Sequence, residues 1–231
     1  MSLIHFKNVS KIYNTVVGPL TVLDNVSFEI GAGEFVSLVG KSGAGKSTLL
    51  RSLIAELAPS KGKVFFDEKD VHKMKHRDLC LLRRRIGMIF QDFKLLPDKT
   101  AFENVAFAME VAGYSDKKIR EDVPEVIKLV GLSDKMANFP VQLSAGEKQR
   151  IAIARALIQR PDIIVADEPT GNLDPINSWD IIKLLVKINE LGTAVILATH
   201  VKEIINTIDK RVISLDKGRI IRDEERGKYL I

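Results

Sequence analysis

Short apolar runs rich in Val, Ile and Leu recur along the chain and alternate with longer amphipathic stretches. They include EFVSLV, IGMIF, DIIVA, TAVILAT and RVISL, several of which are nearly continuous and bounded by Gly, Pro or Asp. Such runs are typical of parallel strands that are buried on both faces. The earlier runs LIHFKNV and VLDNVSFEI alternate better and predict an antiparallel edge layer. The pattern therefore predicts an α/β fold with a mostly parallel sheet.

Helical stretches lie between the strands and are concentrated in the middle of the chain. In SDKKIREDVPEVIKLVGL, the residues Ile119, Val123, Val126 and Val130 fall at helical spacing, and Pro124 is expected to kink or split this helix. The helix-rich block interrupts the strand pattern without forming a second strand-helix unit. We therefore predict one domain over 1–231, with a core lobe of 1–91 and 161–231 and an α-helical subdomain of about 92–160.

The composition fits a globular protein that works in a reducing compartment. Hydrophobic residues make up 45% of the 231 residues and charged residues 28%. No uncharged apolar run approaches the ~18 residues that span a bilayer, and the start MSLIHFK lacks the apolar region of a secretory signal. The single cysteine, Cys80, excludes an internal disulfide. We expect a cytosolic protein.

The net charge of +5 suits a role near phosphates or an anionic membrane face. Most charges are interspersed, which equally fits an ordinary solvated surface. Only Arg83 to Arg85 and the tail segment RDEERGK look clustered. The arginines are interpreted first as a solvated helix end, with a lipid-contacting patch as the alternative.

The segment EFVSLVGKSGAGKSTLLRSLI carries the chain's strongest chemical signal. It contains G-x-x-x-x-G-K-S between an apolar strand and an apolar helix, the context that a phosphate-binding loop requires. Backbone N–H groups and the helix start would cradle phosphates, while Lys46 adds a full charge and Ser47 can bind Mg²⁺. The predicted nucleotide-binding residues of this loop are Gly40, Lys41, Ser42, Gly43, Ala44, Gly45, Lys46, Ser47 and Thr48.

Polar residues follow three other predicted core strands. Asp167 and Glu168 end PDIIVADE, Gln91 follows IGMIF, and His200 follows TAVILAT. Ligands bind at the carboxyl edge of such sheets, so these residues are expected to meet there. Asp167 suits Mg²⁺, and Glu168 can accept a proton from a water that attacks the γ-phosphate. Tyr13 could stack on an adenine ring, or could be only an exposed aromatic residue on an edge strand.

The octapeptide LSAGEKQR reads as a helix start. Ser144 is the expected N-cap and Glu147 completes a capping box, with Ile151, Ala154 and Ile158 on the buried face. It could be a well-capped helix and nothing more. The small residues after the cap also leave amide groups open to an anion. Because the chain already has a phosphate loop, this second site makes most sense against the nucleotide of another copy.

These motifs, in this order and spacing, resemble the nucleotide-binding domain of the ABC ATPases over essentially the whole chain. The resemblance implies an ATP hydrolase with a RecA-like core, which uses ATP and Mg²⁺ as cofactors. It implies catalytic roles for Glu168, His200 and Gln91, and a magnesium site formed by Ser47, Gln91 and Asp167. It also implies an ATP-dependent head-to-tail homodimer.

In that dimer, Ser144 and Gly146 of one copy would bind the nucleotide held by the other, and residues 172–174 would communicate across the interface. The usual family motif at this position is L-S-G-G-Q, whereas this chain has Ala145 and Glu147. Glu147 is a familiar variant. Ala145 adds a methyl group where the backbone approaches phosphate, which bears on how tightly the dimer closes.

Longer stretches, including QDFKLLPDKTAFENVAFAMEVAG and DEPTGNLDP, resemble the cell-division branch of this family. That resemblance implies an integral membrane partner of the FtsX type, a place at the cytoplasmic face of the bacterial cell membrane and indirect control of cell-wall hydrolases. No nucleic-acid partner is expected. Apolar residues after Gln91 are candidates for docking a coupling helix of the partner, or for packing inside the helical subdomain: Phe93, Leu95, Leu96 and Phe102.

Two other functions remain open at this point. The chain could be the ATPase of a related exporter of lipoproteins or hydrophobic compounds, because those domains share much of this sequence. It could also be a soluble ABC protein acting on ribosomes or DNA. That class usually has two such domains in one chain or a long coiled-coil insertion, and this sequence has neither.

Overall fold

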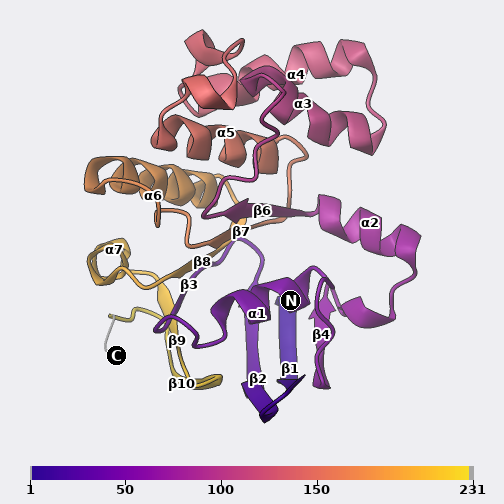
Figure 1. Ribbon diagram of the computed structural model, residues 1–231, viewed down its shortest axis with the longest axis vertical. Helices are drawn as coiled ribbons and strands as arrows, with labels where there is room; N and C mark the ends of the chain where they lie inside the picture. The colour runs from indigo at the N-terminus through magenta and orange to yellow at the C-terminus, as the bar shows by residue number, and fades with distance from the viewer. Residues whose placement is uncertain (1, 229–231) are drawn as a thin grey trace.

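A computed structural model of the chain describes residues 2–228 and contains two β-sheets with helices around them (Figure 1). The larger sheet has the strand order β10-β9-β3-β8-β7-β6. Its strands pair in parallel except for the hairpin of β9 and β10. This sheet consists of β3 (Phe35–Val39), β6 (Ile86–Phe90), β7 (Ile163–Asp167), β8 (Ala194–Thr199), β9 (Arg211–Asp216) and β10 (Arg219–Glu224).

The smaller sheet is the antiparallel layer that the alternating early runs predict. Its order is β2-β1-β4-β5, and β1 pairs antiparallel with both β2 and β4. The strands are β1 (Ser2–Thr15), β2 (Gly18–Gly31), β4 (Lys61–Phe66) and β5 (Lys69–Asp70). The α/β fold with a mostly parallel core, an antiparallel layer and a helical region is therefore confirmed.

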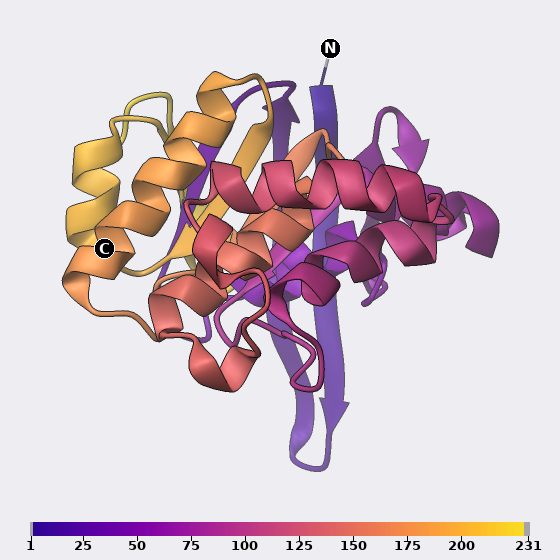
Figure 2. The ribbon, with the colours of Figure 1, turned by 90° about the horizontal axis from the view of Figure 1, so that it is seen from above.

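The helices occupy distinct parts of the molecule. In Figure 1, α3, α4 and α5 lie together at one end, α6 and α7 lie beside the large sheet, and α1 lies next to the antiparallel sheet; Figure 2 shows the same helices from above. The α-helices are α1 (Lys46–Leu53), α2 (His76–Arg84), α3 (Ala101–Ala112), α4 (Asp116–Leu129), α5 (Ala145–Leu157), α6 (Pro175–Glu190) and α7 (Lys202–Ile208). Short 3-10 turns span Val71–Lys73, Ser133–Lys135 and Pro140–Gln142.

Helix α4 shows how packing overrides a local helix breaker. Pro124 lies inside a single helix, so the expectation of a split at this residue is wrong. Ile119 and Val123 before the proline and Ile127 after it are all buried in one core. Because both halves are anchored on the same face, one missing backbone hydrogen bond does not end the helix.

Two apolar cores cover the two faces of the large sheet. One lies between this sheet, α1 and the antiparallel layer, and the other lies under helices α3 to α6. Side chains along β7 point alternately into the two cores. Ile163 and Val165 belong to the first core, and Ile164 and Ala166 belong to the second. Burial on both faces explains why the strand sequence is continuously apolar. Among residues 2–228, no helix is both long enough and apolar enough to cross a bilayer.

Candidate functional site

The central strands of the large sheet end at one edge, where a cleft of about 660 Å³ opens. Parallel pairing places Phe90 opposite Asp167 and Asp167 opposite Ala198, so the residues that follow β6, β7 and β8 meet there. Gln91, Glu168 and His200 line this cleft together with 42–48 of the phosphate loop and with Leu20 and Val22 of β2. The structure therefore brings together most of the predicted site residues.

The phosphate loop joins β3 to α1 and depends on glycine at its last turn. Gly45 is the N-cap of α1 and has a φ of 105°, a value that side chains disfavour. A Cβ atom here would lie 2.8 Å from the carbonyl oxygen of Val22. Gly45 cannot supply a side-chain cap, and none is present in the described structure. The first amides of α1 therefore face the cleft without a capping side chain and can bind an anion.

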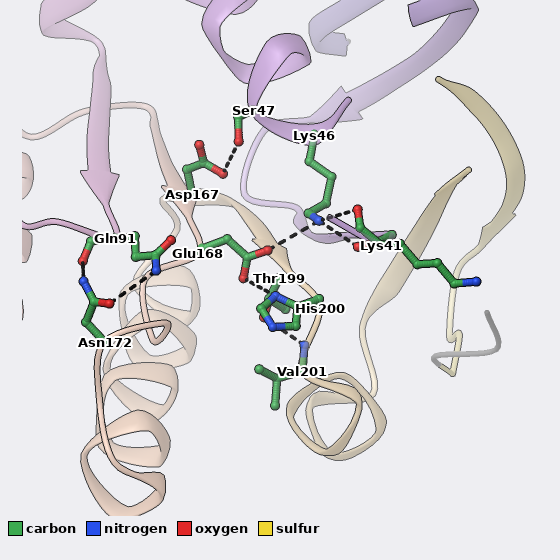
Figure 3. A network of polar contacts seen from close by, with 11 residues as sticks. Lys41, Lys46, Ser47, Gln91, Asp167, Glu168, Asn172, Thr199, His200 and Val201 are labelled. Atoms are coloured by element: carbon green, nitrogen blue, oxygen red, sulfur yellow. Dashed lines mark hydrogen bonds and ion pairs between the residues drawn. The ribbon is translucent and has the colours of Figure 1, made fainter. Parts of the chain in front are cut away.

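Lys46 is buried at the base of the cleft, with 6% of its side chain exposed. Its Nζ donates hydrogen bonds to the carbonyl oxygens of Gly40, at 2.7 Å, and Lys41, at 3.3 Å. Nζ also lies 3.4 Å from Oε1 of Glu168 (Figure 3). A full positive charge is thus held in the cleft beside the phosphate loop.

A second contact joins Ser47, which lines the cleft, to Asp167 at the end of β7. The Ser47 hydroxyl lies 3.0 Å from Oδ1 of Asp167, although the two residues are 120 positions apart (Figure 3). Burial raises the pKa of Asp167, the neighbouring Glu168 carboxylate raises it further, and the Ser47 hydrogen bond opposes both. A cation at this position would relieve that unfavourable burial.

This oxygen pair suits Mg²⁺, which prefers a few protein oxygens completed by water and phosphate. Among residues 2–228, no group of three or more His, Cys, Asp or Glu side chains is arranged as metal ligands. The donor set thus fits a metal that arrives with a nucleotide better than a metal held by the protein alone.

Glu168 lies between Lys46 and His200 (Figure 3). Its Oε2 is 2.9 Å from Nδ1 of His200, and its backbone N–H donates to the Ala198 carbonyl oxygen at 2.9 Å. Glu168 has a φ of 50°, a left-handed conformation that is unusual for a side chain of this size and is often found at functional sites. A carboxylate accepts hydrogen bonds, so this contact corresponds to the His200 tautomer with a proton on Nδ1.

Gln91 lines the cleft, but its side-chain amide is bonded to Asn172. The Gln91 Nε2 donates to Oδ1 of Asn172 at 3.3 Å, and the Asn172 Nδ2 donates to the Gln91 carbonyl oxygen at 3.0 Å. Gly171 packs against the Gln91 side chain so closely that a Cβ would lie 2.7 Å from Nε2. The structure therefore links Gln91 to the loop after Glu168 rather than to the Ser47–Asp167 pair.

Tyr13 lies on β1 opposite Leu20 of β2, close to the cleft but not among its lining residues. Nζ of Lys11 is 5.1 Å from the centroid of the Tyr13 ring, a cation–π contact. The part of this hairpin that lines the cleft is formed by Leu20 and Val22. The aromatic residue would have to turn toward the cleft to stack on a base.

Ser144 is the N-cap of α5, as predicted, and the capping box with Glu147 is present. The Glu147 N–H donates to Oγ of Ser144 at 3.3 Å, and the Ser144 N–H donates to Oε2 of Glu147 at 2.8 Å. This backbone hydrogen bond lowers the pKa of Glu147. Gly146 is buried against Asn177 of α6, where a Cβ would lie 2.5 Å from Oδ1. Ser144 is exposed and does not line the cleft of its own chain.

The contacts that hold the loop after Gln91 were not predicted in the sequence analysis. Phe93 and Lys94 both have positive φ values, of 60° and 49°. Arg155 of α5 donates to both of their carbonyl oxygens, at 2.9 and 2.6 Å. The fully buried Asn104 donates to the Leu96 carbonyl oxygen at 3.1 Å and accepts from the Leu96 N–H at 2.7 Å. The available signals were a charge inside the apolar segment RIAIARAL and an Asn within an apolar helix.

Comparison with known proteins shows which proteins this chain is similar to. Residues 23–171 match the model of a family described as ABC transporter. The cell-division ATP-binding protein FtsE of Bacillus subtilis is 50% identical over 221 residues, covering 96% of this chain and 97% of the relative. FtsE of Escherichia coli K12 is 44% identical over 218 residues, covering 94% of this chain and 97% of the relative.

Solved structures agree with the fold over nearly the whole chain. The dimeric structure of MJ0796, a bacterial ABC transporter cassette, has a TM-score of 0.87 at 39% identity and covers 97% of this chain and 99% of that one. A dimeric post-hydrolysis state of MJ0796 bound to ADP and Pi has a TM-score of 0.87 at 38% identity, with the same coverage.

Proposed function

The chain belongs to the ABC transporter family and is an ATP-hydrolysing ABC ATPase, and from this premise we propose that it drives a membrane complex in bacterial cell division. The observation that carries the chemistry is the contact of Glu168 with both Lys46 and His200 in the phosphate-loop cleft. The cell-division role rests on 44–50% identity to FtsE proteins over nearly the full chain.

In the proposed mechanism, Lys46 and the loop amides bind the β- and γ-phosphates of ATP. The γ-phosphate competes with Glu168 for Nζ of Lys46, because both carry negative charge and lie within reach of one ammonium group. As Lys46 turns to the phosphate, the Glu168 carboxylate is free to accept a proton from the attacking water. His200 holds that carboxylate through Nδ1. A contact of its other ring nitrogen with the γ-phosphate would require that nitrogen to carry a proton as well.

We assign Mg²⁺ to the Ser47 hydroxyl and Asp167, with the nucleotide phosphates and water completing its ligands. When bound, the metal would neutralise charge that develops on the transferred phosphoryl group. Gln91 is the third expected ligand. Its amide would first have to leave Asn172, so Gln91 would sense the nucleotide only when that pair opens.

A second copy of the chain would complete the nucleotide-binding site. Ser144 and the first amides of α5 are exposed and do not line the cleft of their own chain, which suits a partner's γ-phosphate. The MJ0796 cassettes described above are dimeric. ATP would therefore close a head-to-tail homodimer, and hydrolysis would reopen it, because only the γ-phosphate joins the two surfaces.

For the membrane complex we propose an integral partner of the FtsX type at the cytoplasmic face of the cell membrane, with cell-wall hydrolases controlled indirectly. The segment after Gln91 offers the docking surface. Phe93, Leu95, Leu96 and Phe102 are all half-buried, and Leu95 and Phe102 pack partly against the helical core. Phe93 and Leu96 are not part of that core and remain the better candidates for contact with the partner.

An exporter ATPase is the second candidate, because the similar MJ0796 structure is described as a transporter cassette. Depletion separates the two functions. Depleting the chain in its host should give filamentous cells, and Glu168→Gln loaded with ATP should be recovered from detergent-solubilised membranes with an FtsX-type protein. Normal division together with recovery of an exporter subunit would replace the cell-division role and leave the ATP chemistry unchanged.

A further inference from the structure

The turn between β9 and β10 is bonded to the phosphate loop as well as to its own hairpin. Lys217 and Gly218 form this two-residue turn, and both have positive φ values, of 44° and 77°. The Gly218 N–H donates to the carbonyl oxygen of Ala44 in the phosphate loop at 3.1 Å. Neither turn residue lines the phosphate-loop cleft. The turn can therefore act on the loop without touching a nucleotide.

Strand β2 holds this turn in place. The Asp24 N–H donates to the Gly218 carbonyl oxygen at 2.9 Å, and Nε of Arg219 donates to Oδ2 of Asp24 at 2.8 Å. The end of the β9–β10 hairpin thus lies beside β2 (Figure 1). Gly218 connects the strand that forms one wall of the cleft with the phosphate loop, although these segments are far apart in the sequence.

The position of the turn requires glycine. A Cβ on Gly218 would lie 2.4 Å from the carbonyl oxygen of Val22, and a Cβ on Gly45 would lie 2.8 Å from the same oxygen. The backbone of β2 at Val22, which lines the cleft, is therefore packed closely against both the turn and the phosphate loop. A side chain at Gly218 would push the turn away from the loop, and its φ of 77° is also disfavoured for side chains.

The hydrogen bond to Ala44 fixes the orientation of the peptide that joins Ala44 to Gly45. No cis peptide occurs among residues 2–228, and in a trans peptide the C=O and N–H groups point in opposite directions. Because the Ala44 carbonyl oxygen is directed to Gly218, the Gly45 N–H is directed away from the turn, and Gly45 lines the cleft. Glycine permits many backbone conformations, so a peptide next to Gly45 could otherwise turn over easily.

We propose that Gly218 is a positioning residue for phosphate binding, because its N–H holds the peptide between Ala44 and Gly45 so that the Gly45 N–H faces a nucleotide phosphate. This inference rests on the proposed binding of phosphates by the loop and adds a residue from outside the loop. An amide that is already oriented in the free chain need not be ordered on binding, which favours affinity. The pair of Asp24 and Arg219 keeps the turn against β2.

Binding of MgATP and of inorganic triphosphate to the purified chain tests this role. Inorganic triphosphate has no base or ribose, so its affinity reports on the phosphate loop alone. Gly218→Ala should weaken binding of both ligands by about tenfold, the effect of losing one hydrogen bond to a charged group. A loss confined to MgATP would show that the turn supports only the cleft wall at Val22, and would overturn the proposal.

Gly131→Ala is the matched control. Gly131 has a φ of 76°, does not line the cleft, and a Cβ there would meet no atom within 4 Å. The substitution therefore imposes similar backbone strain without disturbing the phosphate loop, and it should change both affinities by less than about twofold. Equal affinities of Gly218→Ala and Gly131→Ala would overturn the role of Gly218.

Amide hydrogen exchange in the unmodified chain, measured by NMR with isotope-labelled glycine, tests the same geometry without a substitution. The Gly218 N–H should be protected in the nucleotide-free chain, and the Gly45 N–H should gain protection when inorganic triphosphate binds. Exchange of Gly218 as fast as in an unfolded peptide, or no response of Gly45 to triphosphate, would contradict the proposal even if Gly218→Ala fails to fold. If the unmodified chain binds neither ligand, the proposed phosphate site itself is wrong.

Discussion

Nζ of Lys46 lies 3.4 Å from Oε1 of Glu168, so the lysine assigned to the γ-phosphate contacts the carboxylate assigned to the attacking water. Both side chains are mostly buried, with exposed fractions of 6% and 16%. Because of this contact, phosphate binding by Lys46 is expected to precede proton transfer to Glu168. A γ-phosphate that draws Lys46 away from Glu168 also frees the carboxylate for proton transfer.

Replacing Lys46 with alanine should weaken ATP binding by about 10- to 100-fold, because a charge-assisted contact to phosphate contributes roughly 1.5–3 kcal/mol. Titration with a fluorescent ATP analogue measures this loss. Lys63→Ala, an exposed lysine on β4, is the control and should bind like the unmodified chain. Equal affinities of the two variants would show that Lys46 does not reach the phosphates.

His200→Ala should lower the turnover number by about 100-fold with little change in ATP affinity, since it removes the group that orients Glu168. Steady-state ATPase assays and binding titrations separate the two effects. His76→Ala, at an exposed position on α2, serves as the control. A variant with unchanged turnover would remove His200 from the mechanism.

Asp167→Asn should change how stability depends on pH. Because the pKa of Asp167 is raised in the fold, the folded chain binds this proton more tightly than the unfolded chain does. Its contribution to stability is thus present at low pH and is lost as the pH rises through the raised pKa. Without Mg²⁺ and nucleotide, the melting temperature of Asp167→Asn should rise relative to that of the unmodified chain as the pH is raised from acidic to neutral.

Addition of MgADP should reverse that difference near neutral pH, where the ionised Asp167 binds the metal and asparagine does so poorly. Thermal scans in chelator and in MgADP make this comparison directly. If the difference between the two melting temperatures stays constant across the pH range, burial of the ionised Asp167 carboxylate does not determine the pH dependence of stability.

Ser144→Ala should lower the free energy of unfolding by about 1 kcal/mol through loss of the helix cap and should also weaken ATP-dependent dimerisation. Ser115→Ala is a matched control, because Ser115 caps α4 in the same way and its side chain accepts from the Lys118 N–H. Denaturant unfolding should show similar costs for both variants. Dimerisation that is equally impaired in both would refute a role for Ser144 beyond capping.

The sequence predicted those parts of the site that depend on local geometry. The glycine and lysine spacing of the phosphate loop, the carboxylates after β7 and the capping box of Ser144 all follow from one short segment each. Parallel pairing then brings the strand ends to one edge, as the register of Phe90 with Asp167 confirms. These features needed no knowledge of which segments pack together.

Contacts between distant segments were not predictable in the same way. Gln91 and Asn172 are 81 positions apart, and nothing in either segment indicates that their amides pair. Arg83 to Arg85 lie at the end of α2 with Arg83 and Arg85 exposed, as expected, but each of the three also has a protein partner that the sequence did not indicate. The charged tail likewise includes β10, which pairs with β9 through backbone hydrogen bonds that do not depend on its charges.

The most direct test of the account is light scattering combined with an ATPase assay on Glu168→Gln. We predict that this variant binds MgATP, forms a particle of twice the mass of the chain and turns over at least about 100-fold more slowly than the unmodified protein. ADP should leave it monomeric, since the γ-phosphate is what joins the two surfaces. Retained turnover, or a monomer saturated with MgATP, would contradict the assignment of Glu168 as the base or the shared nucleotide site, respectively.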